Sequence, residues 1–398
     1  MSTGLTPSEQ FVTALCQESF LRLWTHPNPK GKKSKELCDY LIVCGPHIVI
    51  ISVKENEYRD TGNETGWERW MKAALEKSFS QIRGAERWLE TVEQVERSDG
   101  RFVSLPERTI RKYYRISVSL GGQGKVPIEW GDVGSGFIHV CNEYSVGALF
   151  QFLDTITDFV DFLRASEELA RSGVLLLFSG GGIEDLIAFY VLQGRSLDLK
   201  SSVGDQPNVF ILHDDLWRGF IESEDFKVMQ EELRESYVWD NLIEYYTNDL
   251  LTDGMIDMHS GQVTNNELAF VTMALQPRTY RAGLAASLLE FLNNEELNSA
   301  ARVVRGNAES AFVFTIGSSE NRESRIHELA LRCLVVRGRC SGVKTVVGIA
   351  TDRPGTSEIG YSSDITYIHI PTWTEEHEHN VQGIQKDLGY FKNVTWEK

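Results

Sequence analysis

Apolar residues gather near the N-terminus in two short runs that predict a pair of strands. They lie within residues 36–54, where Asp39 opens the first strand, Lys54 closes the second, and Gly45-Pro46 joins them. Short apolar runs separated by glycine and proline are typical of strands joined by a tight turn. The segment is therefore predicted to form a half-buried hairpin.

The length of the turn fixes which residues of the hairpin face each other. A two-residue turn places Cys44 opposite His47 and therefore Asp39 opposite Ser52. Opposed residues share a face of the sheet, and side chains two apart on one strand point the same way. Lys54 thus joins Asp39 and Ser52. An acid and a lysine on a half-buried face are costly to place there without a use.

The segment before the hairpin, residues 8–21, has the apolar period of a helix. Phe11, Ala14, Leu15 and Glu18 fall at i, i+3, i+4 and i+7. This spacing puts them on one stripe of an amphipathic helix. Glu18 is therefore predicted to lie on the apolar stripe of this helix.

A long helical pattern follows the hairpin, from residue 67 to residue 95, and it contains Gln81. A further strand is predicted at residues 113–120. Three tryptophans sit near helical spacing on the long helix and are predicted to be core anchors, with base stacking as the alternative: Trp67, Trp70 and Trp88.

The chain is predicted to be an α/β protein with three regions. Residues 1–150 hold the elements described above, residues 151–305 are rich in helices, and residues 306–398 form a small α/β unit. The strands expected in the last region cover residues 311–317, 343–350 and 364–370. In the middle region, Arg278 and Arg281 could clamp an anion or pair with nearby acidic residues.

The hairpin pattern resembles that of the PD-(D/E)XK nuclease superfamily, to which many restriction enzymes belong. In that superfamily an acid at the start of one core strand is followed by [Asp/Glu]-x-Lys at the end of the next. Asp39 matches the first acid and Lys54 matches the lysine, but Ser52 stands where the second acid is expected. The resemblance covers the first third of the chain and implies a restriction-endonuclease-like core of order α-β-β-α-β.

The resemblance also implies roles for neighbouring residues. Glu18 matches an acid that members often carry on the preceding helix, and Gln81 matches a glutamine on the helix after the lysine strand. The implied catalytic residues are Lys54, Asp39, Glu18 and Gln81. The implied ligands of Mg²⁺ or Mn²⁺, with nearby glutamates replacing the missing acid, are Asp39, Glu18, Glu55 and Glu36.

The activity implied by the resemblance is metal-dependent hydrolysis of phosphodiester bonds in DNA or RNA, with DNA the favoured partner. In such a site the metal polarises the phosphate and lowers the pKa of a bound water. By analogy the chain is expected in restriction or anti-phage defence, with the remaining regions regulating the nuclease or assembling it into a homo-oligomer. The alternative is an inactive nuclease fold kept as a scaffold for protein or nucleic acid, with Ser52 marking lost catalysis.

The charge of the chain limits how it could meet nucleic acid. The formal net charge is −17 and the pI is near 5.1, whereas binding to a phosphate backbone depends on cationic contacts. A local basic face can still steer a polyanion. The lysines Lys30, Lys32, Lys33 and Lys35 either form such a face or are an ordinary solvated loop.

The cysteines and apolar segments bear on location. None of the six cysteines forms a CxxC pair, as expected of reduced thiols in the cytoplasm. The first residues lack the pattern of a signal peptide, and no apolar run reaches the length of a membrane span. The chain is therefore expected to be cytoplasmic, with no membrane partner.

Overall fold

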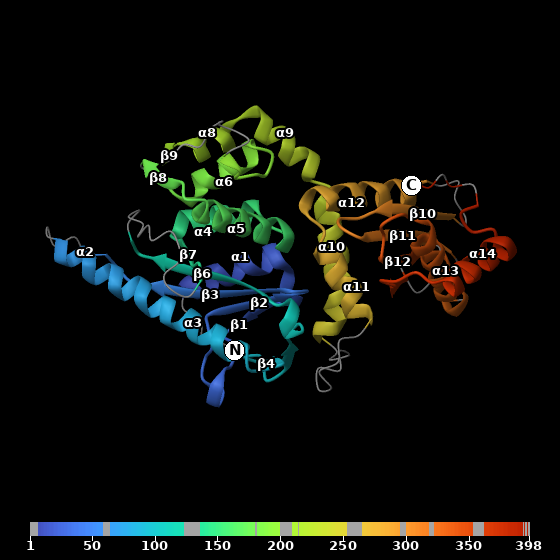
Figure 1. Ribbon diagram of the computed structural model, residues 1–398, viewed down its shortest axis with the longest axis horizontal. Coiled ribbons are helices and arrows are strands. Elements are labelled where there is room, and N and C mark those ends of the chain that lie inside the picture. Colours follow the sequence, from blue (N-terminus) through green and yellow to red (C-terminus); the bar gives the residue numbers. More distant parts are fainter. Residues whose placement is uncertain are drawn as a thin grey trace. The chain divides into compact units, whose positions relative to one another are not determined.

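The structure is a computed structural model of a chain with mixed α/β content, as predicted (Figure 1). It describes residues 7–58, 64–122, 136–179, 181–199, 209–213, 215–252, 265–294, 300–317, 322–352, 362–392, 394 and 396. The chain divides into two compact units. Unit 1 comprises residues 1–231 and 248–262, and unit 2 comprises residues 232–247 and 263–398.

A five-stranded mixed sheet, in the order β1-β2-β3-β6-β7, forms the centre of unit 1. Its strands are β1 (Thr25–Pro27), β2 (Tyr40–Cys44), β3 (His47–Glu55), β6 (Lys112–Leu120) and β7 (His139–Cys141). The first three strands are antiparallel, and β6 and β7 continue the sheet parallel to β3. In the hairpin, Cys44 pairs with His47, so the predicted two-residue turn is confirmed.

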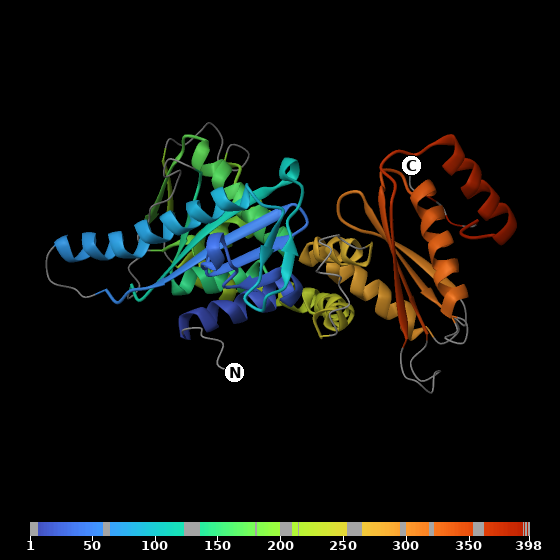
Figure 2. The same ribbon diagram turned by 90° about the horizontal axis from the view of Figure 1, so that it is seen from below.

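The two faces of this sheet are covered by different helices (Figure 2). Helix α1 (Pro7–Trp24) covers one face, where Thr13 Oγ1 and Tyr40 Oη lie 2.9 Å apart. Helix α3 (Lys77–Leu89) covers the other face, where its Ile82 belongs to the same buried cluster as Ile50. Side chains alternate along each strand, so neighbouring strand residues face opposite sides of the sheet.

The long helix predicted after the hairpin is present but is interrupted and shorter than expected. It consists of α2 (Glu64–Met71), a π-helical turn (Lys72–Glu76) and α3. It ends at Leu89, because residues 94–96 form strand β4 (Gln94–Glu96), which pairs with β5 (Phe102–Ser104). The predicted strand at residues 113–120 is β6.

The apolar stripe of α1 is shifted by one residue from the predicted one. The buried side chains include Val12, Leu15, Cys16 and Ser19, whereas Phe11 is 45% exposed and Glu18 is exposed. Ser19 donates hydrogen bonds to the carbonyl oxygens of Leu15 and Phe150. The prediction that Glu18 lies on the apolar stripe is wrong, because this contact turns Ser19 toward the core.

The predicted boundary after residue 150 does not separate two units. Helices α4 (Glu143–Phe152) and α5 (Ile156–Arg171) pack on α1 through three aromatic rings. The Phe20 ring lies 5.3 Å from that of Phe150 and 4.8 Å from that of Phe159. A cut after residue 150 would split α4 and remove Phe159 from this cluster. Residues 151–231 therefore belong with the N-terminal sheet.

The rest of unit 1 is mainly helical. Its further elements are β8 (Leu175–Ser179), α6 (Ile183–Leu192), β9 (Val209–His213), α8 (Leu216–Glu222) and α9 (Glu224–Leu233), of which the last crosses the unit boundary after Glu231. Strands β8 and β9 pair in parallel. Alternate residues on them, such as Leu177 and Ile211, are about half exposed.

Unit 2 is built on a four-stranded sheet in the order β10-β11-β12-β13. Its strands are β10 (Ala300–Arg305), β11 (Ser310–Ile316), β12 (Thr345–Thr351) and β13 (Ser363–His369). Its helices are α10 (Ser236–Thr252, partly in unit 1), α11 (Asn265–Ala274), α12 (Arg278–Asn293), α13 (Arg322–Arg339) and α14 (Glu375–Leu388). The three strands predicted in this region are present. The predicted boundary at 305/306 is wrong, because β10 pairs with β11.

The state of the cysteines and the apolar character of the helices can be compared with the sequence-based expectations. All six cysteines are free, and five of them are buried. Among the helices of the described segments, none has both the length and the apolar character needed to cross a bilayer.

Candidate functional site

Asp39 stands directly before β2 and is almost fully buried, with 3% of its surface exposed. Its Oδ2 oxygen accepts a hydrogen bond of 2.8 Å from the backbone N–H of Val53. The same oxygen lies 3.4 Å from Lys54 Nζ. A buried carboxylate is tolerated when it has such donors. The predicted pairing of Asp39 with Lys54 on one face of the hairpin is therefore confirmed.

Gln81 ties the end of β3 to helix α3. Its Oε1 oxygen accepts hydrogen bonds from Lys54 Nζ at 2.7 Å and from Ser52 Oγ at 2.9 Å. Ser52 is fully buried, whereas the Lys54 side chain is 25% exposed. The ammonium group of Lys54 therefore has one amide and one carboxylate partner and still reaches solvent.

A buried hydrogen bond between β6 and α3 fixes where Gln81 lies relative to the sheet. Ser117 on β6 pairs with Ser52 and donates a hydrogen bond of 2.8 Å to Ser78 Oγ. Ser78 lies three residues before Gln81, so both project from the same side of α3. Both serines are fully buried. This hydrogen bond holds α3 in place, so that Gln81 lies over the start of β2 and the end of β3.

Glu36 lies on the solvent side of Asp39, Lys54 and Gln81. Gln81 Nε2 lies 3.5 Å from Glu36 Oε1, at the outer limit of a hydrogen bond, and Glu36 is exposed. Between Glu36 and Asp39, Cys38 is buried and donates to the Tyr40 carbonyl oxygen. Burial, and then the carboxylates of Asp39 and Glu36, raises the pKa of the Cys38 thiol well above its usual value. Cys38 is thus an inert thiol beside two acids. We call Glu36, Asp39, Ser52, Lys54 and Gln81 the hairpin site.

Two of the predicted metal ligands lie elsewhere. Glu55 follows Lys54 on β3 and therefore points to the opposite face, where its carboxylate accepts a hydrogen bond from Ser8 of α1. Glu18 is exposed on α1, which covers that same opposite face. Both assignments are corrected, because neither side chain shares the face of Asp39 and Lys54.

The acidic groups that remain suit a weakly held cation. Within the described segments, no group of three or more His, Cys, Asp or Glu side chains could hold a metal ion. The hairpin site offers the carboxylates of Asp39 and Glu36, whereas the amide oxygen of Gln81 is already occupied by Lys54 and Ser52. Mg²⁺ commonly keeps several waters and binds through one or two carboxylates together with substrate phosphates. The donors of the hairpin site fit that mode of binding.

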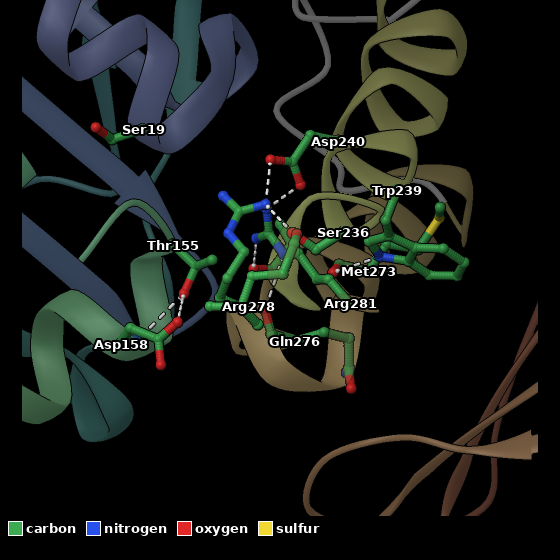
Figure 3. A network of polar contacts seen from close by, with 12 residues as sticks. Ser19, Thr155, Asp158, Ser236, Trp239, Asp240, Met273, Gln276, Arg278 and Arg281 are labelled. Carbon is green, nitrogen blue, oxygen red and sulfur yellow. Dashed lines mark hydrogen bonds and ion pairs between the residues drawn. The ribbon is translucent and has the colours of Figure 1, made fainter. Parts of the chain in front are cut away.

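The tryptophans and arginines noted in the sequence have structural roles. The Trp67 and Trp70 rings are stacked with their centroids 5.1 Å apart, and both pack with Tyr58. Trp88 packs against the buried cluster that contains Ile50 and Ile82. In unit 2, the buried Arg278 and Arg281 both pair with Asp240 (Figure 3). The pairing alternative for these arginines is therefore confirmed.

Comparison of the chain with protein-family models, with curated proteins and with solved structures found no match. Its function must therefore be inferred from the geometry of the hairpin site.

Three contacts of the hairpin site could not be read from the sequence. They are the Val53 N–H bond to Asp39, the Ser52 bond to Gln81 and the approach of Glu36 to Gln81. The parity of the hairpin placed Ser52 on the right face. The partner of Ser52 depends on the docking of α3, for which the local sequence carries no signal.

Proposed function

We propose that unit 1 is a divalent-metal-dependent nuclease that hydrolyses phosphodiester bonds, in DNA in preference to RNA. One observation carries the proposal: Asp39, Lys54 and Gln81, from three separate segments, are joined by hydrogen bonds on one face of the sheet. An acid, a lysine and a glutamine in these places resemble the site residues of the PD-(D/E)XK superfamily. The mixed sheet with a helix on each face supports the same proposal.

The residues of the hairpin site would have different roles in phosphodiester hydrolysis. Asp39 and Glu36 would hold Mg²⁺ or Mn²⁺, which when bound polarises the phosphate and acidifies a water. Lys54, held by Gln81, would place a positive charge against the phosphate oxygen on which negative charge develops. Gln81 would act as a positioning residue, because its Oε1 oxygen fixes the Lys54 ammonium group.

The setting of this activity is part of the proposal. Cysteines that are mostly buried and form no disulfide within the described segments suit the reducing cytoplasm. A role in restriction or anti-phage defence rests on analogy with other nucleases of this kind. Self-association of the chain would bring two hairpin sites together for cutting both strands of a duplex.

A second candidate is a scaffold with the nuclease fold and no catalysis. The observation that favours it is Ser52, which replaces an acid and is occupied by its bond to Gln81. Glu55 cannot replace that acid, since it bonds Ser8 on the other face. In this alternative the hairpin site binds nucleic acid or protein and leaves phosphodiester bonds intact.

The test is cleavage by the full chain. Duplex DNA, single-stranded DNA and RNA are incubated with the protein in Mg²⁺, in Mn²⁺ and in EDTA. We expect cleavage of duplex DNA in either metal, none in EDTA, and a loss of at least 100-fold in Asp39→Asn, which keeps an acceptor for the Val53 N–H. Equal cleavage by Asp39→Asn would refute the nuclease. If the wild type cleaves nothing under any condition, the nuclease proposal is refuted and the scaffold function is the one that stands.

A further inference from the structure

We infer that residues 31–35, which we call the lysine loop, bind the phosphate backbone of a double-stranded nucleic acid beside the hairpin site. The inference rests on the proposed function, because it names the substrate class and the surface that holds it. It is carried by the charge, the backbone conformation and the position of the loop.

The lysine loop is a local excess of free positive charge on an acidic protein. Lys32, Lys33 and Lys35 are exposed, and no ion pair is found for them among the described residues. Lys30, just before the loop, is by contrast neutralised by Glu96 at 2.6 Å. With a net charge of −17 on the whole chain, a polyanion would meet repulsion over most of the surface. A patch of three unpaired lysines is where it could approach.

The backbone of the loop is held in one conformation. The Gly31 N–H donates to the Lys35 carbonyl oxygen at 2.7 Å, and the Ser34 N–H donates to the Gly31 carbonyl oxygen at 3.1 Å. Between them, Lys33 (φ 60°) and Ser34 (φ 55°) both lie in the left-handed region. Such residues other than glycine are uncommon and cost free energy, and they cluster where a ligand is held.

Both ends of the loop are anchored to the body of unit 1. The Lys30 N–H donates to the Glu96 carbonyl oxygen, and the Leu37 N–H donates to the Pro29 carbonyl oxygen, each over 2.8 Å. The three ammonium groups are therefore carried on a closed loop with both ends fixed. Charges presented in this way lose less conformational entropy on binding than charges on a free tail.

The loop leads directly into the hairpin site. Lys35 is followed by Glu36, whose carboxylate lies beside Gln81. Three residues span at most about 11 Å, so the Cα atom of Lys33 lies within that distance of the Glu36 Cα atom. Nucleotides along one strand of a duplex rise by about 3.4 Å each. The lysines would thus contact phosphates within a few nucleotides of the bond at the hairpin site.

The surroundings favour a duplex over a single strand. Proteins that bind single strands combine positive charge with aromatic side chains on which bases stack. The tryptophans of α2 and α3, Trp67, Trp70 and Trp88, are instead packed into core clusters. The lysine loop offers charge without stacking, which suits backbone contacts that are independent of base sequence.

The test measures binding without cleavage. Full-length protein carrying Lys54→Met is titrated in EDTA with a fluorescent DNA duplex and with its single strand, at several salt concentrations. The variants are Lys33→Asn and the triple change Lys32→Gln, Lys33→Asn, Lys35→Gln. Asparagine tolerates the left-handed backbone, so the loop is kept. Lys112→Gln is the control, because Lys112 is exposed at the far end of β6, opposite His47.

We expect the duplex to bind more tightly than the single strand. The slope of log K against log salt should fall in magnitude by about 0.9 for each lost contact, and by about 2–3 in the triple variant. Lys112→Gln should leave the slope unchanged. An unchanged slope in the triple variant, or tighter binding of the single strand, would overturn the inference.

The two proposals can fail separately. If the duplex binds through the lysine loop but the wild type cleaves nothing, the proposed binding surface is supported and the proposed nuclease activity is refuted. Metal-dependent cleavage combined with an unchanged salt slope in the triple variant would refute the loop and leave the nuclease standing.

Discussion

Lys54 and Gln81, 27 residues apart, are joined by a hydrogen bond of 2.7 Å from Nζ to Oε1. The bond connects the end of β3 to the helix that covers it. Gln81 accepts from Ser52 through the same oxygen, so one amide group organises two residues of the strand. The arrangement gives Lys54 a fixed position, although it lies at the exposed end of an apolar strand.

The amide of Gln81 should therefore contribute to stability. In Gln81→Leu, the buried Ser52 hydroxyl and the Lys54 ammonium group lose an acceptor, and we expect the free energy of unfolding to fall by about 1–3 kcal/mol. Gln81→Glu combined with Glu36→Gln is the control, because it keeps an acceptor oxygen in the same place without setting two carboxylates side by side. Urea unfolding at pH 7 measures both. A Gln81→Leu variant as stable as the wild type would contradict the role of the amide.

Ser52 provides a direct probe of metal binding. In Ser52→Asp, a third carboxylate is buried near Asp39, and like charges repel in a desolvated site. We expect a lower melting temperature in EDTA and a larger gain on adding Mn²⁺ than the wild type shows, because a ligand that binds only the folded state stabilises it. Ser52→Ala controls for loss of the hydroxyl. An equal Mn²⁺ shift in all three proteins would argue against metal at this face.

The aromatic contact between α1 and α5 should hold residues 151–231 to the N-terminal sheet. The Phe159 ring is fully buried and lies 4.8 Å from that of Phe20. Phe159→Ala should lower the free energy of unfolding by about 3–5 kcal/mol. Phe11→Ala, at a side chain that is 45% exposed, should cost much less. Similar losses in the two variants would contradict the extent of unit 1.

Acid should destabilise unit 1 through a buried histidine. Burial, and then the nearby Arg97, lowers the pKa of His26 from 6.5 to about 3. Between these two values the unfolded chain binds a proton that the folded chain does not, so stability falls as pH falls, by about 1.4 kcal/mol per pH unit. In His26→Leu the slope of unfolding free energy between pH 6.5 and 4.5 should be shallower by about this amount. An unchanged slope would show that His26 is protonated in the folded state.

The sequence was sufficient to predict the hairpin and insufficient to predict what surrounds it. A two-residue turn and the alternation of side chains fix the faces of Asp39, Ser52 and Lys54 with no knowledge of the rest of the molecule. Gln81 was assigned to the site by resemblance to a superfamily, and the structure brings it within hydrogen-bonding distance of Lys54.

Glu18 was misplaced because two neighbouring phases of the helix fit the apolar residues of α1. Leu15 belongs to both phases, and the choice depends on the bond from Ser19 to Phe150, which lies 131 residues away in the sequence. The unit boundaries failed for the same reason. Long-range contacts such as that of Phe20 with Phe159, or the pairing of β10 with β11, leave no periodic pattern in the local sequence.

Two adjacent residues on opposite faces of β3 test the central claim most directly. Lys54 shares its face with Asp39 and Gln81, whereas Glu55 bonds Ser8 on the other face. The measurement is the rate of duplex DNA cleavage in Mn²⁺ by Lys54→Met and Glu55→Gln, with circular dichroism confirming that both are folded. We predict a loss of at least 100-fold in Lys54→Met and a change of less than about threefold in Glu55→Gln, because only Lys54 faces the bond to be broken. Wild-type cleavage by Lys54→Met, or an equal loss in both variants, would contradict the account.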